Sequence, residues 1–172
     1  MTFFKANASF EDTVMPHLDA AYNLARWMTR NPDDAHDVVQ ESLVRALKYF
    51  SGFRGGDGRS WFLTIVRNSC YTFFQRRSHK AEEPLETDLM AEQHQHGPEG
   101  AAINQAQREK IQQALADLPA EYREVTVLRE LEDLSYKEIS AIVGVPMGTV
   151  MSRLARARQR LQLTLAELRN PQ

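Results

Sequence analysis

The fold of this chain is decided by the stretch Ser135 to Arg158, which reads SYKEISAIVGVPMGTVMSRLARAR. Ser135 and Glu138 have the spacing of a capping box, which starts a helix, and an apolar face follows them. Gly144 and Pro146 mark a tight turn before a second, basic helix. A short capped helix, a glycine turn and a basic helix predict a helix-turn-helix.

The second helix of this pair predicts a DNA contact. At about 100° per residue, four polar residues share one face and no acidic residue joins them: Thr149, Ser152, Arg153 and Arg156. Apolar residues occupy the opposite face, where they would pack on the domain. An arginine in the major groove can bind guanine bidentately or bind phosphate. A solvated basic surface is the alternative, but the capped helix and tight turn before it favour DNA binding.

The rest of the chain has apolar residues at spacings of three and four, which predicts an all-α fold with almost no sheet. Residues 79–103 hold six acidic residues and the breaker pair Gly97-Pro98, which are typical of a flexible acidic linker. We therefore expect two small helical domains, 10–78 and 104–168, joined by this linker. The expected helices lie near 10–30, 32–50, 60–77, 104–117, 119–132, 136–143 and 147–168.

Two details of the N-terminal helices follow from local rules. Pro16 is compatible with a helix over 10–30 only because it falls near the first turn. Asn31 caps the next helix, with Pro32 in its first position. We expect this second helix to bury one apolar face, formed by Ala35, Val38, Val39, Leu43, Ala46 and Leu47.

Charge is distributed in blocks. The net charge of -2, from 21 basic and 23 acidic residues, argues at first against a nucleic-acid partner. However, residues 45–80 carry eight basic side chains and one acidic, and residues 146–172 carry five and one. Phosphate affinity depends on such local clustering. No apolar stretch suits membrane insertion, and residues 1–10 lack a secretory pattern, so we expect a cytoplasmic protein.

A second basic constellation surrounds the glycine-rich loop 52–59. Arg54, Arg59 and Arg67 supply charge, and Phe53 or Trp61 supplies an aromatic wall for an unstacked base. The loop matches neither a phosphate-binding nor a dinucleotide pattern, which argues against an ATP site. A plain interhelical turn, with Trp61 in the core, fits these residues equally well.

Other clusters are weaker. Asp37, Gln40 and Glu41 lie on the outer face of the helix 32–50, as a protein-docking patch or as ordinary solvated surface. His94 and His96 lack a second ligand pair, so we expect no metal and no cofactor. The only cysteine, Cys70, is interpreted as a small buried hydrophobe. No catalytic constellation is recognisable, and we expect no enzyme activity.

Four segments in this order resemble one family: Asp33 to Glu41, Trp61 to Asn68, Leu118 to Val125, and Gly144 to Arg158. The sequence resembles the extracytoplasmic-function (ECF) sigma factors of the bacterial sigma-70 family. The resemblance covers residues 10–78 and 104–166, and it implies that residues 10–78 form sigma region 2 and residues 104–168 form region 4. It implies that the chain binds RNA polymerase and directs promoter-specific initiation, in a stress or uptake regulon.

The resemblance also implies residue roles. Asp37, Gln40 and Glu41 would bind the clamp helices of the largest polymerase subunit, and region 4 would meet the flap. The -10 promoter element would contact Phe53, Arg54, Arg59, Trp61, Arg67 and Asn68, and the -35 element would contact Thr149, Ser152, Arg153 and Arg156. An anti-sigma factor, membrane-anchored in many relatives, would be the inhibitor.

Two residues depart from the family pattern. Met151 stands where many relatives carry Lys or Arg, and Ala155 is smaller than the residue of some relatives, so the -35 sequence is not defined. We expect the free chain to bind promoter DNA weakly, with both basic faces covered until polymerase separates the domains. The alternative is a stand-alone helix-turn-helix regulator that binds an operator. It would need a dimerisation helix or ligand pocket, and the sequence indicates neither.

Overall fold

The computed structural model describes residues 8–80 and 101–169, and every regular element in these ranges is a helix. The all-α prediction is confirmed. The helices are α1 (Phe10–Val14), α2 (Leu18–Thr29), α3 (Pro32–Tyr49), α4 (Gly58–Lys80), α5 (Ala101–Ala116), α6 (Ala120–Thr126), α7 (Tyr136–Val143) and α8 (Met147–Arg169). We call α1–α4 the N-terminal domain and α5–α8 the C-terminal domain. Most of the expected linker, with His94 and His96, lies outside the described residues.

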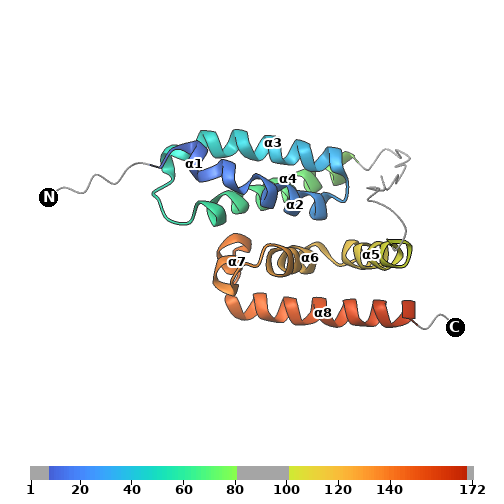
Figure 1. The fold of residues 1–172 in the computed structure, drawn as a ribbon. Helices are drawn as coiled ribbons and strands as arrows, with labels where there is room; N and C mark the ends of the chain where they lie inside the picture. The colour runs from blue at the N-terminus through green and yellow to red at the C-terminus, as the bar shows by residue number, and fades with distance from the viewer. Residues whose placement is uncertain (1–7, 81–100, 170–172) are drawn as a thin grey trace.

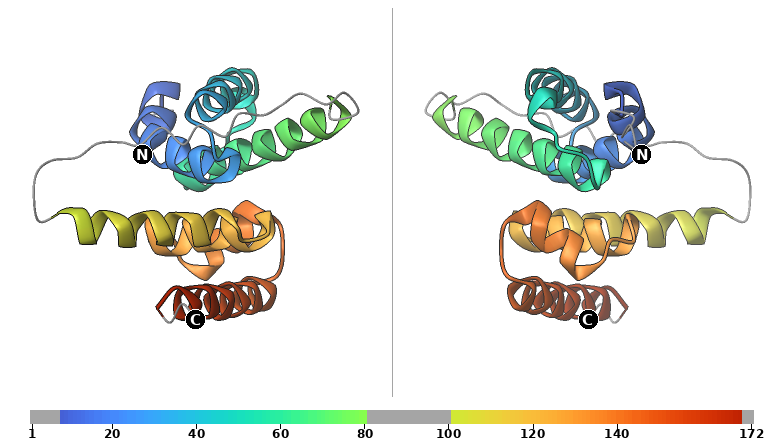
Figure 2. Two further views of the ribbon diagram at one scale, coloured as in Figure 1. Left: turned by 90° about the vertical axis from the view of Figure 1, so that its right-hand side faces the viewer. Right: turned by 90° about the vertical axis from the view of Figure 1, so that its left-hand side faces the viewer.

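The molecule is built in layers. The N-terminal domain forms one layer, α5–α7 pack beneath it, and α8 lies on the far side of α5–α7 (Figure 1). The two side views show the same order (Figure 2). The N-terminal domain meets the C-terminal one where α4 packs on α7 and α2 packs on α6, whereas α8 packs on α5, α6 and α7. One apolar cluster of buried side chains continues from α2 and α4 into α6, α7 and α8.

The helix starts follow the predicted local chemistry. Asn31 Oδ1 accepts hydrogen bonds from the backbone N–H groups of Asp33 (2.9 Å) and Asp34 (3.0 Å). The capping box at Ser135 and Glu138 is present in both directions. Gly58 opens α4 against α1, where a Cβ would lie 2.7 Å from a side-chain carbon of Thr13. Only glycine permits that close approach.

Three local predictions were wrong. The helix expected over 10–30 is interrupted by a 3-10 turn at Met15–His17, because Pro16 has no backbone N–H to continue the ladder. The helix expected over 119–132 is α-helical only to Thr126 and continues as a π-turn over Val127–Leu131. Leu47, expected in the core, is 63% exposed. None of the helices in the described ranges is both long and apolar enough to cross a bilayer.

Candidate nucleic-acid interface

The helix-turn-helix is formed by α7 and α8. Gly144 takes the left-handed conformation (φ 72°) that ends α7, and the Ser140 hydroxyl donates a hydrogen bond to the Val145 carbonyl across the turn (2.5 Å). Val150 and Leu154 are buried against the domain. The helical wheel therefore predicted the buried side of α8 correctly. The opposite side of α8 faces away from the N-terminal domain (Figure 2).

The four predicted -35 residues do not share one environment. Ser152 and Arg156 are exposed, and Thr149 is partly exposed. Arg153 instead reaches α6, where its guanidinium lies 3.7 Å from a carboxylate oxygen of Glu121 and 4.0 Å from one of Glu124. Arg153 thus sits at the inner edge of the α8 face, on the side that leads to the N-terminal domain.

The same edge of α8 contacts Tyr122 of α6. The Arg160 guanidinium lies 5.2 Å from the centre of the Tyr122 ring, within the range of a cation–π interaction. Hydrogen bonding to the neighbouring Tyr122 side chain also raises the pKa of Arg156, which is fully exposed. Arg156 and Arg160 thus both lie beside Tyr122, along one edge of α8.

The N-terminal basic cluster is held by carboxylates of the C-terminal domain. Arg67 of α4 makes a bidentate pair with Glu124, with Nε to Oε2 at 2.9 Å and Nη2 to Oε1 at 3.2 Å. Glu124 is fully buried, and its carboxylate pairs with Arg67 on one side and lies 4.0 Å from the Arg153 guanidinium on the other. Burial lowers the pKa of Arg67, but the hydrogen bonds and charge of Glu124 outweigh it and leave that pKa raised. One carboxylate therefore joins predicted DNA-binding arginines from both domains.

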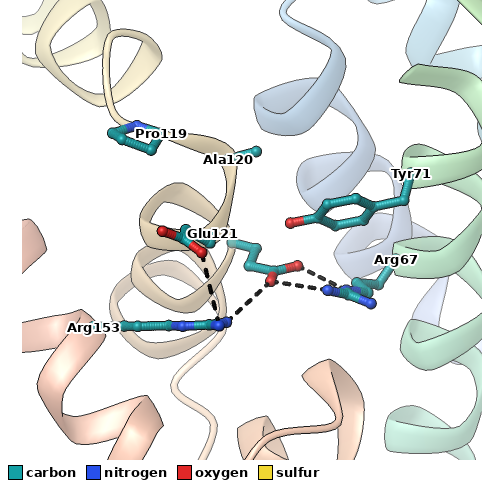
Figure 3. A pocket seen from close by; sticks show the side chains of 7 residues that line it. Arg67, Tyr71, Pro119, Ala120, Glu121 and Arg153 are labelled. Carbon is teal, nitrogen blue, oxygen red and sulfur yellow. Dashed lines mark hydrogen bonds and ion pairs between the residues drawn. The ribbon is translucent and has the colours of Figure 1, made fainter. Parts of the chain in front are cut away.

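This three-residue network borders a cavity of about 380 Å³ between the domains. Tyr71 lines it from α4, and Pro119, Ala120 and Glu121 line it from the start of α6 (Figure 3). The Arg67 guanidinium also lies 4.1 Å from the centre of the Tyr71 ring. Arg67 is thus fixed by an ion pair and an aromatic ring together, which orients it away from solvent.

Arg59 is held in a similar way. Its Nη2 donates to the backbone carbonyl of Glu132 (2.5 Å) and lies 3.4 Å from the Glu132 carboxylate. The Asn23 side chain of α2 donates to the other carboxylate oxygen of Glu132 (3.1 Å). Glu132 lies just after the π-turn, so this turn brings a carboxylate to the N-terminal domain.

Arg123 of α6 is a further contact between the domains that sequence reasoning missed. It is 6% exposed, and it donates from Nη1 to the Met28 carbonyl (3.0 Å) at the end of α2 and from Nη2 to the Leu118 carbonyl (2.8 Å). No carboxylate pairs with it among the described residues. Burial, and then the charge of Arg30, lower its pKa. Helix-end carbonyls carry partial negative charge, which compensates this buried cation.

The remaining predicted -10 residues lie around the glycine loop. Phe53 stacks on Phe50 at 5.9 Å between ring centres, and Trp61 lies 5.0 Å from Phe53. Both Phe53 and Trp61 are partly exposed, and Arg54 and Asn68 are exposed. The structure therefore groups the aromatic residues of the site but separates them from Arg59 and Arg67, which point into the domain contact.

The predicted docking patch lies on α3, on a face that no other described helix covers. Asp37 and Gln40 are exposed, whereas Glu41 pairs with Arg45 (2.6 Å) and Arg76 (3.4 Å). Val44 (68% exposed) and Leu47 extend the same stripe with apolar surface. An exposed mixture of acidic and apolar groups on one helix is typical of a protein-binding surface.

Two negative expectations concern metals and thiols. No group of three or more His, Cys, Asp and Glu side chains that could hold a metal ion occurs within residues 8–80 and 101–169. Cys70 is fully buried in the core, as expected. Burial, and then the negative charge of Glu124, raise the pKa of its thiol to about 12. The folded thiol is therefore a poor nucleophile.

Two further site residues that the sequence did not reveal, Glu124 and Glu132, are acidic. Glu124 and Glu132 come from a segment whose net charge is negative, and their partners lie 57 and 73 positions earlier in the chain. The only local signal is that Glu124 shares a helix face with the apolar residues Ala120, Val127 and Leu128. A carboxylate in such a position must be paired, but its partner is not readable from sequence.

Comparison with known proteins agrees with this architecture. The chain matches the family model for Sigma-70 region 2 over residues 13–80 and the one for Sigma-70, region 4 over residues 108–161. Both halves are therefore those of a sigma-70-type protein.

Individual relatives show which group of sigma-70 proteins the chain resembles. The ECF RNA polymerase sigma factor SigE of Mycolicibacterium smegmatis is 34% identical over 163 residues, covering 94% of this chain and 63% of that protein. The ECF RNA polymerase sigma-E factor of Salmonella typhimurium strain 14028s is 32% identical, covering 73% of this chain and 71% of that protein. The sigma factor RpoE of Bartonella quintana, solved in complex with the anti-sigma factor NepR, has a TM-score of 0.74 and 27% identity, covering 91% of this chain and 96% of that one. The chain belongs to the ECF RNA polymerase sigma factors.

Proposed function

We propose that this chain is a promoter-recognition subunit of bacterial RNA polymerase. It binds core polymerase, carries it to the promoters of one stress or uptake regulon, and helps to open the start site. Residues 10–78 act as region 2, residues 104–168 act as region 4, and residues 79–103 connect them. The chain itself catalyses no reaction, because the chemistry of RNA synthesis belongs to the polymerase. The observation that carries this proposal is the match of both domains, in order, to the two sigma-70 regions.

The proposed residue roles divide by face. The α3 stripe with Asp37, Gln40 and Glu41 binds the clamp helices of the largest polymerase subunit, and region 4 contacts the flap. The glycine loop and α4 read the -10 element, where stacking on Phe53 or Trp61 offsets the cost of unstacking a base. The first turns of α8 read the -35 element in the major groove.

Regulation by an anti-sigma factor is part of the proposal. The Bartonella quintana relative was solved with such a protein bound. In the present chain, the free arrangement already pairs Arg59 and Arg67 with carboxylates of the C-terminal domain. An anti-sigma factor therefore needs only to stabilise a compact arrangement of the domains in order to keep region 2 from the promoter. In this proposal the anti-sigma factor is anchored in the membrane, and its release of the chain activates transcription.

The test is run-off transcription. Purified core polymerase and the full chain are added to a pool of genomic fragments, and transcript starts are sequenced. Discrete starts that share two spaced elements are the expected result. If no starts appear from a folded chain without an inhibitor, the proposal is wrong. A tight operator-specific gel shift by a dimer of the chain alone would then favour the helix-turn-helix regulator.

A further inference from the structure

The exposed face of α8 has an unusual edge of two methionines. Met147 is 50% exposed and Met151 is 52% exposed. They are four residues apart in the first two turns of the helix, so their side chains lie on the same edge. The first turns of the second helix are also the part of a helix-turn-helix that contacts base edges.

The two edges of the α8 face differ in chemistry. The inner edge carries Arg153 and Arg156, which lie near Glu121 and Tyr122 of α6. The methionine edge continues, two turns further on, to Arg158, whose guanidinium lies 2.9 Å from a carboxylate oxygen of Glu130. Basic groups therefore flank the face on both sides, as phosphate strands flank a groove.

The centre of the face carries small side chains. Ser152 and Ala155 are exposed between the two edges, and a Cβ added at Gly148 would meet no atom within 4 Å. Small residues let the helix backbone come close to the floor of a groove. The long methionine side chains then reach furthest into it, from one edge only.

The thioether side chain of methionine is best suited to one feature of the base edges, an apolar methyl group. It has no hydrogen to donate and accepts hydrogen bonds weakly. The 5-methyl group of thymine is the apolar feature that the major groove presents, and it is read by apolar contact. A flexible, polarisable methionine side chain adapts well to such a contact.

We infer that Met151, together with Met147, reads the methyl group of thymine within the -35 element. This edge selects thymine by apolar contact, whereas a lysine or arginine at position 151 would contact phosphate or guanine. The inference rests on the proposed function, because it concerns DNA bound by α8. It specifies which base feature this chain prefers at one edge of the element.

The test removes only the methyl group. Holoenzyme is reconstituted from core polymerase and the full chain, and its -35 element is obtained by selection from random duplexes. Each thymine of that element, on either strand, is then replaced singly by deoxyuridine, and binding is measured by fluorescence anisotropy. Loss of one buried methyl group weakens binding by roughly fourfold. We expect this loss at one or two positions.

The variants assign the effect to the side chains. Holoenzyme with Met151→Ala or Met147→Ala should bind thymine and uracil duplexes equally at the affected position. Leu163→Ala is the matched control, because Leu163 is an exposed apolar residue of the same helix (60% exposed) but lies outside its first turns. It should keep the full preference for thymine. Met151→Lys should lose the preference and increase the salt dependence of binding by about one phosphate contact.

Several outcomes overturn the inference. These outcomes are tolerance of uracil at every position, a selected element without thymine, and a thymine preference that both methionine variants keep. In each case the holoenzyme still initiates at a two-element promoter, so the proposed function stands. If the holoenzyme selects no -35 element at all, the proposed function fails first, and this inference fails with it.

Discussion

The two predicted DNA-binding faces differ in what covers them. In region 2, Arg59 and Arg67 are paired with Glu132 and Glu124 of the other domain. In region 4, the outer side of α8 points away from region 2, with Ser152 and Arg156 exposed (Figure 1). We expected both faces to be covered in the free chain, but only Arg59 and Arg67 of the region 2 face are paired in this way, whereas Arg54 and Asn68 are exposed. The fold therefore restrains part of one basic face and leaves most of the other accessible.

The surfaces of the chain are of two kinds: some are accessible as the chain stands, and others are already paired between the domains. The α3 stripe and α8 are accessible in the compact arrangement, so neither needs a rearrangement before it can bind a partner. Contact of Arg59 or Arg67 with a promoter first requires their carboxylates to be displaced. Under the proposed roles, polymerase binding through α3 can precede domain separation, whereas promoter contact by Arg59 and Arg67 must follow it.

The largest expected effect comes from removing the carboxylate shared by both domains. Glu124→Gln leaves Arg67 and Arg153 without their buried partner. We predict that the free energy of unfolding falls by about 3 kcal/mol, the lower end for a broken buried pair, because Arg67 keeps some solvent contact. Urea denaturation of the full chain measures this loss.

The matched control is Glu130→Gln. Glu130 forms an equally short pair with Arg158 (2.9 Å), but both side chains are about half exposed. Such a pair contributes less than about 1 kcal/mol. Equal losses in the two variants would mean that burial between the domains adds nothing to the Glu124 pair.

The next effect concerns the open face. Arg156→Ala should weaken binding of the holoenzyme to the -35 element by about 1 to 3 kcal/mol and leave binding to core polymerase unchanged. The reason is that Arg156 is exposed on the face of α8 that is proposed to enter the groove, and it pairs with no described residue of the N-terminal domain. Anisotropy titrations with promoter duplex and with core polymerase measure the two affinities separately. A matching loss of both would contradict the division of roles.

A smaller effect is expected on the α3 face. Asp37→Lys should weaken core polymerase binding about tenfold, because it reverses a charge at a complementary interface. Asp37 suits this test better than Glu41, which also holds Arg45 and Arg76 within its own domain. Glu109→Lys makes the same charge change on exposed α5 and should leave the affinity unchanged. Identical affinities for the Asp37 and Glu109 variants would remove α3 from the polymerase interface.

Some of the structural features behind these tests could be predicted from the sequence, and others could not. The capping box at Ser135 and the turn at Gly144 act within a few residues, so local rules predicted α7 and the start of α8 correctly. The interruption at Pro16 and the π-turn after Thr126 depend on how several turns pack, and local rules missed them. The sequence also predicted the buried side of α8, because helical periodicity determines it.

The contact between domains was beyond such rules. Any arginine can bind phosphate, so the sequence alone favours that role for Arg67. Only the packing of α2 and α4 on α6 and α7 brings Arg67 to Glu124. A helical wheel placed Arg153 with Arg156, but it could not show that Arg153 lies within reach of Glu121. Side-chain partners separated by more than 50 residues are set by tertiary structure alone.

The smallest expected effect uses Cys70 as a reporter of domain separation. In the compact arrangement the pKa of this thiol is about 12, because of burial and then of Glu124, so alkylation should require transient opening. Arg59→Ala removes a partly buried pair, whose side chains are 32% and 9% exposed. Its loss should cost about 1 kcal/mol and raise the opened population, and hence the alkylation rate, roughly fivefold. Iodoacetamide labelling followed by mass spectrometry measures the rate. Arg158→Ala, which removes a pair remote from the domain contact, should leave it unchanged.

The pH dependence of the same reaction identifies the reacting state. A thiol that reacts only after opening has an ordinary pKa, so the rate should rise with pH and level off above about 8.5. A thiol that reacts within the compact arrangement would keep gaining thiolate as the pH approaches 12. A rate that continues to rise through pH 10, or one that Arg59→Ala leaves unchanged, would show that Cys70 does not report on the contact between Arg59 and Glu132.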